Sequence, residues 1–351
     1  MPSTDPWAGA RSPRWVVEHL NSDDQPLGTI PVAKGSVKVA AFARLGGSAS
    51  LTLSVRDAQN AGINWFRDRI AISYDPGIAG IEPIPMGVYL FDSPTLNQGI
   101  AATWDVDLLT KMAIVDQEET TNTYALPEGS NIIAAVVALI ESTGETRISA
   151  TPSDAVTTSA LAFEAGTPKL TIINELLTSA NYSSLWTDGS GQYRVEPYVE
   201  PNARPLAYTF AEGEASIHKP DWQREQDILS VPNRVTVVSP GSDTEPPIIG
   251  VAENNDPDSD YSIPARGRII SRTEEVSDMS SVAAAVAQAE RLLQGGMAPQ
   301  ATLAVEHAIV PLEPHSLVRF TSGGETRRAT VREMNFDLTF DSQCDALWRE
   351  L

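Results

Sequence analysis

The sequence is poor in cysteine and histidine. Its one cysteine, Cys344, excludes an internal disulfide framework and fits synthesis in a reducing compartment. We expect the Cys344 side chain to be a small buried group. The histidines lie far apart along the chain and include no HExxH pair, which disfavours a zinc site, so each is expected to be structural. They are His19, His218, His307 and His315.

Basic residues and long apolar runs are also scarce. The chain has 25 Lys and Arg against 46 Asp and Glu, a formal net charge of −21. Phosphate contacts need an excess of lysine and arginine, so sequence-independent nucleic-acid binding is disfavoured on exposed surfaces. Residues 132–140 form the longest apolar run, which is about half of what spans a bilayer. They predict a buried helix, and residues 1–15 have no apolar core of an export signal.

Catalytic motifs are missing as well. The sequence contains no GxSxG elbow, no GxGxxG and no GxxxxGK phosphate loop. The loop with Asp256, Asp258 and Asp260 resembles the start of a calcium loop. In that register, however, Tyr261 stands where an EF-hand has glycine, and Gly267 where it has glutamate. We therefore interpret the loop as an acidic surface segment, leave calcium binding open, and assign no catalytic, cofactor-binding or metal-binding residue.

One alternative function survives these exclusions. Among 46 carboxylates, two could lie at the separation that glycoside hydrolysis requires, and sequence spacing cannot identify them. Tryptophans could also form a platform for sugars, although tryptophan is more often a core residue. The candidates are Trp104, Trp186, Trp222 and Trp348. A β-rich protein that binds or hydrolyses host cell-wall carbohydrate therefore remains possible.

The most readable part of the chain is its middle. Thr167 and Pro168 have the residue types of an N-cap and a first helical position, and apolar residues recur at helical spacing from Leu170 to Leu177. Two strand-like runs follow, at 182–186 and 192–195, around a glycine-rich turn at 188–191. The sequence thus predicts a helix packed on a hairpin.

The rest of the chain is mainly β. Period-2 alternation and turn residues predict several short strands in residues 15–115, typical of a barrel or sandwich, after a loose arm at 1–14. Residues 116–200 change to an α/β pattern. Residues 201–351 are β again, with one long helix at 279–293 that Asp278 could cap. We expect this helix to pack its Val/Ala/Leu stripe against the outside of the second β domain.

The order of segments along the chain also resembles that of a known protein family, which residue spacing alone does not reveal. The order of several segments is similar to that in hub or minor tail proteins of tailed bacteriophages, particularly siphophages of actinobacteria. No single motif is diagnostic, and the similarity covers most of residues 85–340. The segments are 105–109 with 116–117, 164–188, 197–198, 231–235 and 266–268 ahead of the Ala-rich helix.

The resemblance implies two tail-tube-like β-barrels joined by a smaller α/β domain, and a homotrimer that presents a quasi-sixfold ring. The implied role is structural, not enzymatic: closing the distal end of the tail, adapting the sixfold tube to a threefold tip, and letting DNA pass. Implied partners are the distal tail protein or tail tube, the tape-measure protein and a central fibre or other tip proteins. Contact with DNA would be transient and non-specific. The implied location is the virion tail tip, after assembly in the host cytoplasm, without a membrane span.

Overall fold

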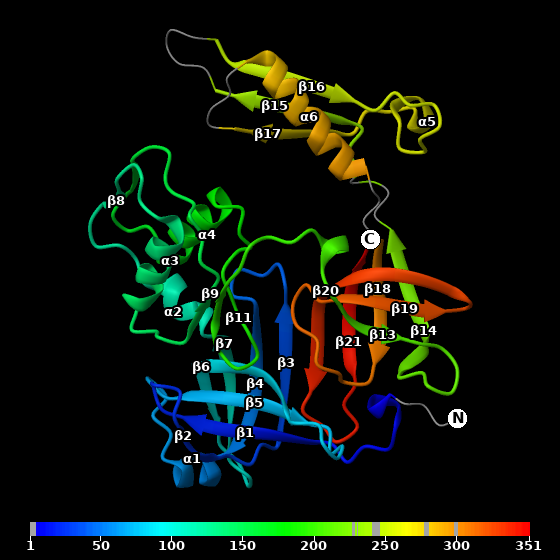
Figure 1. Ribbon diagram of the computed structural model, residues 1–351. Helices are drawn as coiled ribbons and strands as arrows, with labels where there is room; N and C mark the ends of the chain where they lie inside the picture. The colour runs from blue at the N-terminus through cyan, green and yellow to red at the C-terminus, as the bar shows by residue number, and fades with distance from the viewer. Residues whose placement is uncertain (1–4, 227–228, 230, 241–245, 277–280, 298–300) are drawn as a thin grey trace. The chain divides into compact units, whose positions relative to one another are not determined.

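The computed structural model describes residues 5–226, 229, 231–240, 246–276, 281–297 and 301–351. The chain forms two compact units. Unit 1 contains residues 1–223, 303–349 and 351, and unit 2 contains residues 224–302 and 350. Strands account for 42% of the chain and helices for 17%, which confirms the mainly β class. Figure 1 shows the elements in chain order by colour.

The first β region of unit 1 is a seven-stranded part of a larger sheet. Alternating side chains such as Leu51 and Leu53, and Val106 and Leu108, are buried, as the period-2 pattern predicted. In space the strands follow the order β2-β1-β5-β6-β7-β4-β3. They are β1 (Arg14–Leu20), β2 (Pro26–Thr29), β3 (Lys34–Ala40), β4 (Gly47–Ser54), β5 (Arg69–Asp75), β6 (Ile84–Asn97) and β7 (Thr103–Thr110), with helix α1 (Val55–Ala61) after β4.

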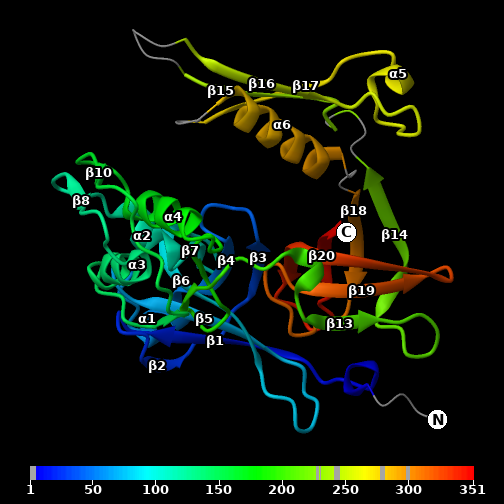
Figure 2. The ribbon, with the colours of Figure 1, turned by 45° about the horizontal axis from the view of Figure 1, so that its top comes forward.

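The second β region of unit 1 is built around buried aromatic side chains. Phe210, Phe320 and Trp348 are fully buried, and the Trp348 ring contacts Phe210 in a tilted arrangement and Phe320 edge-on. Its strands follow the spatial order β13-β19-β20-β21-β18-β14. They are β13 (Leu206–Phe210), β14 (His218–Gln226), β18 (Ala301–His307), β19 (Leu317–Ser322), β20 (Glu325–Asp337) and β21 (Cys344–Glu350). Figure 2 shows β13, β14, β18 and β19 in a second view.

Both β regions belong to one sheet. Glu333 to Asp337 of β20 pair antiparallel with Ala40 to Ser36 of β3, so 13 strands form a continuous ladder. Apolar side chains of both regions also share one core. Among the described strands the main path has two ends, β14 and β2, and hydrogen bonds do not close either region into a ring. The structure thus shows large antiparallel sheets, while the closed barrels that the resemblance implied are not seen in the described residues.

The two β regions repeat one connectivity. Six strands of the first region, taken in chain order as β1, β3, β4, β5, β6 and β7, lie in the spatial order β1-β5-β6-β7-β4-β3. Replacing them in chain order by β13, β14, β18, β19, β20 and β21 gives the observed order of the second region. One difference is that β1 is antiparallel to β5 whereas β13 is parallel to β19. The chain therefore contains the same sheet plan twice.

The middle of unit 1 has its own apolar core between short helices and two small sheets. The helix at Ile132–Glu141 confirms the buried helix expected at 132–140, and the side chain of Asn131 caps it by accepting from Ala134 N. The predicted turn joins two paired strands, but the first of them is only Trp186–Thr187, not the predicted 182–186; the second has a further parallel neighbour at Ile148–Ala150. The elements are α2 (Met112–Gln117), β8 (Tyr124–Leu126), α3 (Ile132–Glu141), β9 (Ile148–Ala150), β10 (Leu161–Phe163), α4 (Lys169–Ser179), β11 (Trp186–Thr187) and β12 (Tyr193–Val195).

The predicted start of α4 is wrong by one residue in its capping. Pro168, not Thr167, occupies the N-cap position, and no side chain caps the helix. The Thr167 hydroxyl instead donates to the Glu164 carbonyl at 2.8 Å. The threonine therefore stabilises the turn before the helix.

Unit 2 is a three-stranded sheet covered on one face by a helix. Helix α6 (Val282–Met297) packs its buried Ala285, Ala289 and Leu293 against Val235 and Val237. The predicted helix at 279–293 is thus confirmed in its core, whereas its placement on the outside of the second β region is wrong. Residues 277–280, including the predicted cap Asp278, lie outside the described part. The other elements are β15 (Arg234–Ser239), β16 (Ile248–Glu253), α5 (Ile263–Arg266) and β17 (Ser271–Glu275).

Two short 3-10 turns complete unit 1, at Pro6–Ala8 and Pro201–Ala203. The first belongs to the arm that the sequence predicted to be loose. Asp5 and Arg11 tie this arm to the second β region: Arg11 Nη1 donates to Ile309 O at 2.8 Å, and Tyr208 Oη donates to Asp5. From residue 5 onward, the arm is therefore held by specific contacts.

Candidate functional site

Four buried charged side chains connect the first β region to the middle of unit 1. Lys111 Nζ lies 2.6 Å from Asp24 Oδ2 and 2.6 Å from Glu145 Oε2. Arg69 reaches the other oxygen of each carboxylate, also at 2.6 Å. Two positive and two negative buried side chains thus compensate one another, and the partly exposed Arg147 adds a third cation, with its Nη1 3.4 Å from Asp24 Oδ2. Such a cluster is stable only while all four members are present.

The electrostatics of the ion cluster agree with this geometry. Burial acts to raise the pKa of Asp24, but the hydrogen bonds and charges of Lys111 and Arg69 outweigh it and lower that pKa. Burial acts to lower the pKa of Arg69, and Asp24 with Glu145 raises it. These two groups therefore remain charged at neutral pH. The cluster holds two parts of the fold together, and Arg69 Nε is buried in it without a hydrogen-bond partner among the described residues.

The hairpin loop of the middle also rests directly on the first sheet. A side chain at Gly189 would place its Cβ 2.1 Å from Pro85 O, and one at Gly191 would meet Val88 Cβ at 2.7 Å. Tyr193 Oη donates to Lys111 O at 2.7 Å in the same area. The close approach explains why the predicted turn contains glycines. Backbone packing against β6 and the ion cluster, which involves Arg69 of β5, together fix the middle against the first β region.

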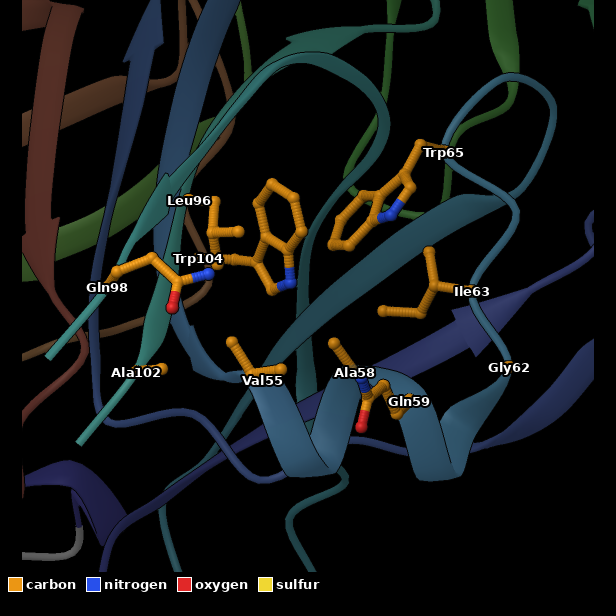
Figure 3. Close-up of a pocket in the computed structure, with 10 residues that line it drawn as sticks. All are labelled: Val55, Ala58, Gln59, Gly62, Ile63, Trp65, Leu96, Gln98, Ala102 and Trp104. Carbon is orange, nitrogen blue, oxygen red and sulfur yellow. The ribbon is translucent and has the colours of Figure 1, made fainter. Parts of the chain in front are cut away.

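A pocket of about 360 Å³ lies at the far end of the first sheet, between α1 and the β6–β7 hairpin. Trp65 and Trp104 form one wall, with ring centroids 5.4 Å apart and planes inclined by 48°. Figure 3 shows Val55 and Ala58 of α1 pointing toward these rings from the opposite side. Gln59 and Gln98 supply the only side-chain amides of the lining, which contains no charged residue.

Large apolar side chains near the pocket are exposed. Phe66, next to Trp65, is 99% exposed, and Ile100, in the turn after β6, is fully exposed. Leu96 lines the pocket and is partly exposed. Exposed apolar groups beside a concave aromatic surface are typical of binding surfaces.

The structure does not bring the four predicted tryptophans together. Trp348 is fully buried in the second β region, and Trp222 packs edge-on against Phe320 there. Trp186 lies on the β11–β12 hairpin. Trp104 instead pairs with Trp65, which the sequence analysis did not single out. The signal that could have found Trp65 is the Trp65-Phe66 pair in a loop between two elements.

The predicted structural roles of the histidines and of Cys344 fit their surroundings. His19 Nε2 lies 2.8 Å from the buried Asp68 Oδ2. His307 packs between Phe210 and Trp348, and burial lowers its pKa to about 4. His218 contacts Phe320, and His315 contacts Phe42 with a lowered pKa that burial causes. Cys344 is fully buried, and burial raises its pKa.

The acidic loop of unit 2 is organised by its own hydrogen bonds. Asp256 Oδ1 accepts from Asp258 N at 3.0 Å, and Asn254 Oδ1 accepts from Asp256 N at 3.1 Å. Within the described ranges, no group of three His, Cys, Asp or Glu side chains could hold a metal ion. No described helix is long and apolar enough to cross a membrane.

Several solved structures of other proteins share this fold. No family model matches the chain, and no curated protein matches it. Among solved structures, the tail protein from Neisseria meningitidis MC58 is similar, with a TM-score of 0.68 at 12% identity over 96% of this chain and 97% of that one. The 43 kDa tail protein of prophage MuSo2 from Shewanella oneidensis gives 0.64 at 12% identity over 97% and 98%.

A third structure extends the same similarity. The prophage tail protein gp18 from Listeria monocytogenes EGD-e gives a TM-score of 0.53 at 10% identity over 95% of this chain and 94% of that one. All three matches run over nearly the full length of both chains. The resemblance to phage tail proteins inferred from segment order is thereby confirmed at the level of the fold.

Proposed function

We propose that this protein is a structural hub of a phage tail tip or baseplate. A repeated sheet plan within one chain carries this proposal: β20 of the second region continues the sheet through β3 of the first. Three copies that extend this pairing would present six equivalent sheets. That arrangement would match a sixfold tail tube on one side and a threefold tip on the other.

The net charge of −21 supports a passive role toward DNA. A bore lined by carboxylates would repel phosphates, so DNA could pass without binding. The ring would close the distal end of the tail tube and let DNA through on ejection. In this proposal the function comes from geometry and charge, and the protein is not an enzyme.

The proposed partners follow from this position. The homotrimer would contact the distal tail protein or tail tube on one face, and a central fibre or other tip protein on the other. The tape-measure protein would end at its bore. The location would be the virion tail tip, with assembly in the host cytoplasm. We also retain the division into an arm at 1–14, β domains at 15–115 and 201–351, and an α/β domain at 116–200 as a proposal.

Counting copies at the tail tip tests the hub. Electron cryomicroscopy of the assembled particle should show three copies around the tail axis, each contributing two β regions to the ring. Light scattering of the purified chain after gel filtration should give a mass near three times 37.7 kDa. Six copies, or a single copy, at the tip would refute the proposal.

A second candidate function is binding of a neutral cell-wall glycan. The observation that favours it is the pocket of about 360 Å³ formed by Trp65 and Trp104 with two glutamine amides and no charge. Aromatic faces stack on sugar rings, and amides can both donate and accept hydrogen bonds to hydroxyls. Saturable binding of a soluble oligosaccharide that requires Trp104 would support this function.

A further inference from the structure

The strand that joins the two β regions has two halves with different partners. The first half of β20 pairs with β19, from Glu325 to Thr330. The second half leaves β19 behind and pairs with β3 from Glu333 to Asp337. The two repeats are therefore joined by strand pairing: the half of β20 that extends beyond β19, which we call the overhang, pairs with the edge of β3.

The same overhang exists in the first repeat, where it has no partner. Strand β6 corresponds to β20, and its first half pairs with β5 as far as Leu90. Residues 91–97 continue along β7, but among the described strands nothing lies on their other edge. Asp92, Ser93 and Thr95 are exposed there.

The matching strand edge also exists in the second repeat without a partner. Strand β14 corresponds to β3, and β18 is its one neighbour among the described strands. It ends the sheet, with Lys219, Asp221 and Gln223 exposed. An unpaired edge exposes a row of backbone donors and acceptors that can pair with another chain.

We propose that the overhang of β6 in one copy pairs antiparallel with the β14 edge of a second copy, as β20 pairs with β3 within a copy. Each copy then offers an overhang on one side and an edge on the other. Such a head-to-tail contact closes into a ring when the rotation between copies allows it. This inference rests on the proposed threefold hub and names the strands that would form its subunit contact.

The repeat also predicts the register. Arg69 pairs with Leu90 at the start of β5, and Leu317 pairs with Thr330 at the start of β19. Leu90 thus corresponds to Thr330, and Thr95 to Asn335. Asn335 pairs with Lys38, so Thr95 should pair with the residue of β14 that corresponds to Lys38.

Contacts along β14 identify that residue. Ala308 N donates to Ile217 O at 2.7 Å, and Lys219 forms an ion pair with Glu306, as in an antiparallel pair. Counting along this pair places Asp221 opposite Ala304, the fourth residue of β18. Ser50, the fourth residue of β4, lies opposite Ser36. Asp221 therefore corresponds to Ser36 and Gln223 to Lys38, so Gln223 should lie opposite Thr95 of the neighbouring copy.

Two prolines limit the strength of this contact. Pro94 in the overhang and Pro220 in the β14 edge have no N–H, so each removes one donor from the ladder. Prolines on edges also discourage pairing with unrelated strands. The contact between copies should be weaker than the β3–β20 pairing, and assembly should depend on concentration.

Disulfide trapping tests the inference. Paired Cα atoms of antiparallel strands lie about 4.5–5.5 Å apart, within reach of a disulfide. The double variant Thr95→Cys with Gln223→Cys should give covalent trimers on non-reducing gels after mild oxidation of the full-length protein. Cys344 is buried, so background cross-linking should be low. The control Thr95→Cys with Glu128→Cys places the second thiol on an exposed residue of the middle and should stay monomeric on the gel.

The outcomes distinguish a failure of the proposed strand pairing from a failure of the threefold hub. Covalent trimers from Thr95→Cys with Gln223→Cys, and none from the control, support the pairing. If light scattering shows trimers but neither this pair nor Asn97→Cys with Asp221→Cys cross-links, the pairing is refuted and the hub stands. Covalent dimers alone would indicate a twofold exchange of strands and also refute it. A chain that stays monomeric at millimolar concentration, and whose cysteine pairs also fail to cross-link in the assembled particle, would refute the pairing, while the copy number at the tail tip would still decide the hub.

Discussion

The Lys111 ammonium lies 2.6 Å from the Asp24 carboxylate, although 87 positions separate the two residues in the sequence. Asp24 belongs to the turn between β1 and β2, and Lys111 follows β7. The contact therefore ties the β1–β2 turn to the end of β7, the point where the middle of unit 1 begins. Because Lys111 is fully buried, its charge depends on Asp24 and Glu145 for compensation.

Removing the Lys111 charge should be strongly destabilising. In Lys111→Met the two buried carboxylates would keep Arg69 as their main cationic partner, and breaking a buried ion pair typically costs about 3–5 kcal/mol. We expect a fall of this size in the free energy of unfolding, measured with urea. Lys38→Met is the control, because Lys38 pairs with Glu333 at a half-exposed site and such pairs contribute about 1 kcal/mol or less. Equal losses in both variants would contradict the importance of the cluster.

Gly250 should be essential for docking of α6. A Cβ atom at this position would lie 2.2 Å from the Ala285 carbonyl carbon of the helix backbone, so Gly250→Ala must push the helix away. Overpacking of this kind costs about 1–3 kcal/mol. Hydrogen exchange of the α6 amides should become faster. Gly99→Ala, where the new Cβ would meet nothing within 4 Å, should leave exchange unchanged. Unchanged protection in Gly250→Ala would mean that the helix packs elsewhere.

Local patterns predicted the elements well because their causes are local. Alternation in residues 51–55 and the Asp188–Gly191 turn depend on neighbouring residues. Residues 51–54 lie in β4 and the turn joins β11 to β12, whereas Val55 begins helix α1. The apolar stripe of α6 also predicted which face is buried. The prediction of the sheet that packs against α6 was wrong, because an apolar stripe shows which face of a helix is buried but not which sheet buries it.

Contacts between distant segments could not be predicted in this way. Nothing in the spacing of Asp24, Arg69, Lys111 and Glu145 links them, since a charged residue in one sequence is most often solvated. Trp65 was missed for a related reason: the pocket exists because the loop after α1 folds back onto Trp104. The order of segments still carried the tail-protein resemblance, since fold similarity depends on the sequence of elements more than on any one contact.

His307 should make stability depend on pH. Its pKa is about 4 in the folded protein against about 6.5 unfolded, so the unfolded chain binds more protons between these values. The contribution of His307 to the free energy of unfolding is therefore fully present above pH 6.5. It falls as the pH drops from 6.5 to 4, and it does not change further below pH 4. Between pH 7 and pH 5 the loss should be about 2 kcal/mol in urea unfolding. His307→Phe should remove this part of the pH dependence, and an identical pH profile in the variant would refute the assignment.

The pocket at Trp65 and Trp104 should bind neutral oligosaccharide without cleaving it. We expect a soluble, uncharged cell-wall oligosaccharide to change tryptophan fluorescence saturably. Trp104→Ala should abolish that change, while Trp222→Ala, in the second β region, should keep it. Absence of saturation in the unaltered protein would remove the glycan-binding candidate and leave the structural hub alone.

Hydrolysis is not expected, because cleavage of a glycosidic bond needs two carboxyl groups on either side of it, and the pocket lining contains neither Asp nor Glu. Incubation with peptidoglycan should therefore release no reducing ends above a heat-inactivated control. Asp105 lies on the same hairpin, beside Trp104. Its carboxylate accepts hydrogen bonds from Thr52 and Asn97, and these lower its pKa, so it is a poor proton donor at neutral pH. Reproducible release of reducing ends that Asp105→Asn abolishes would overturn the non-enzymatic role and favour a carboxylate-pair glycosidase.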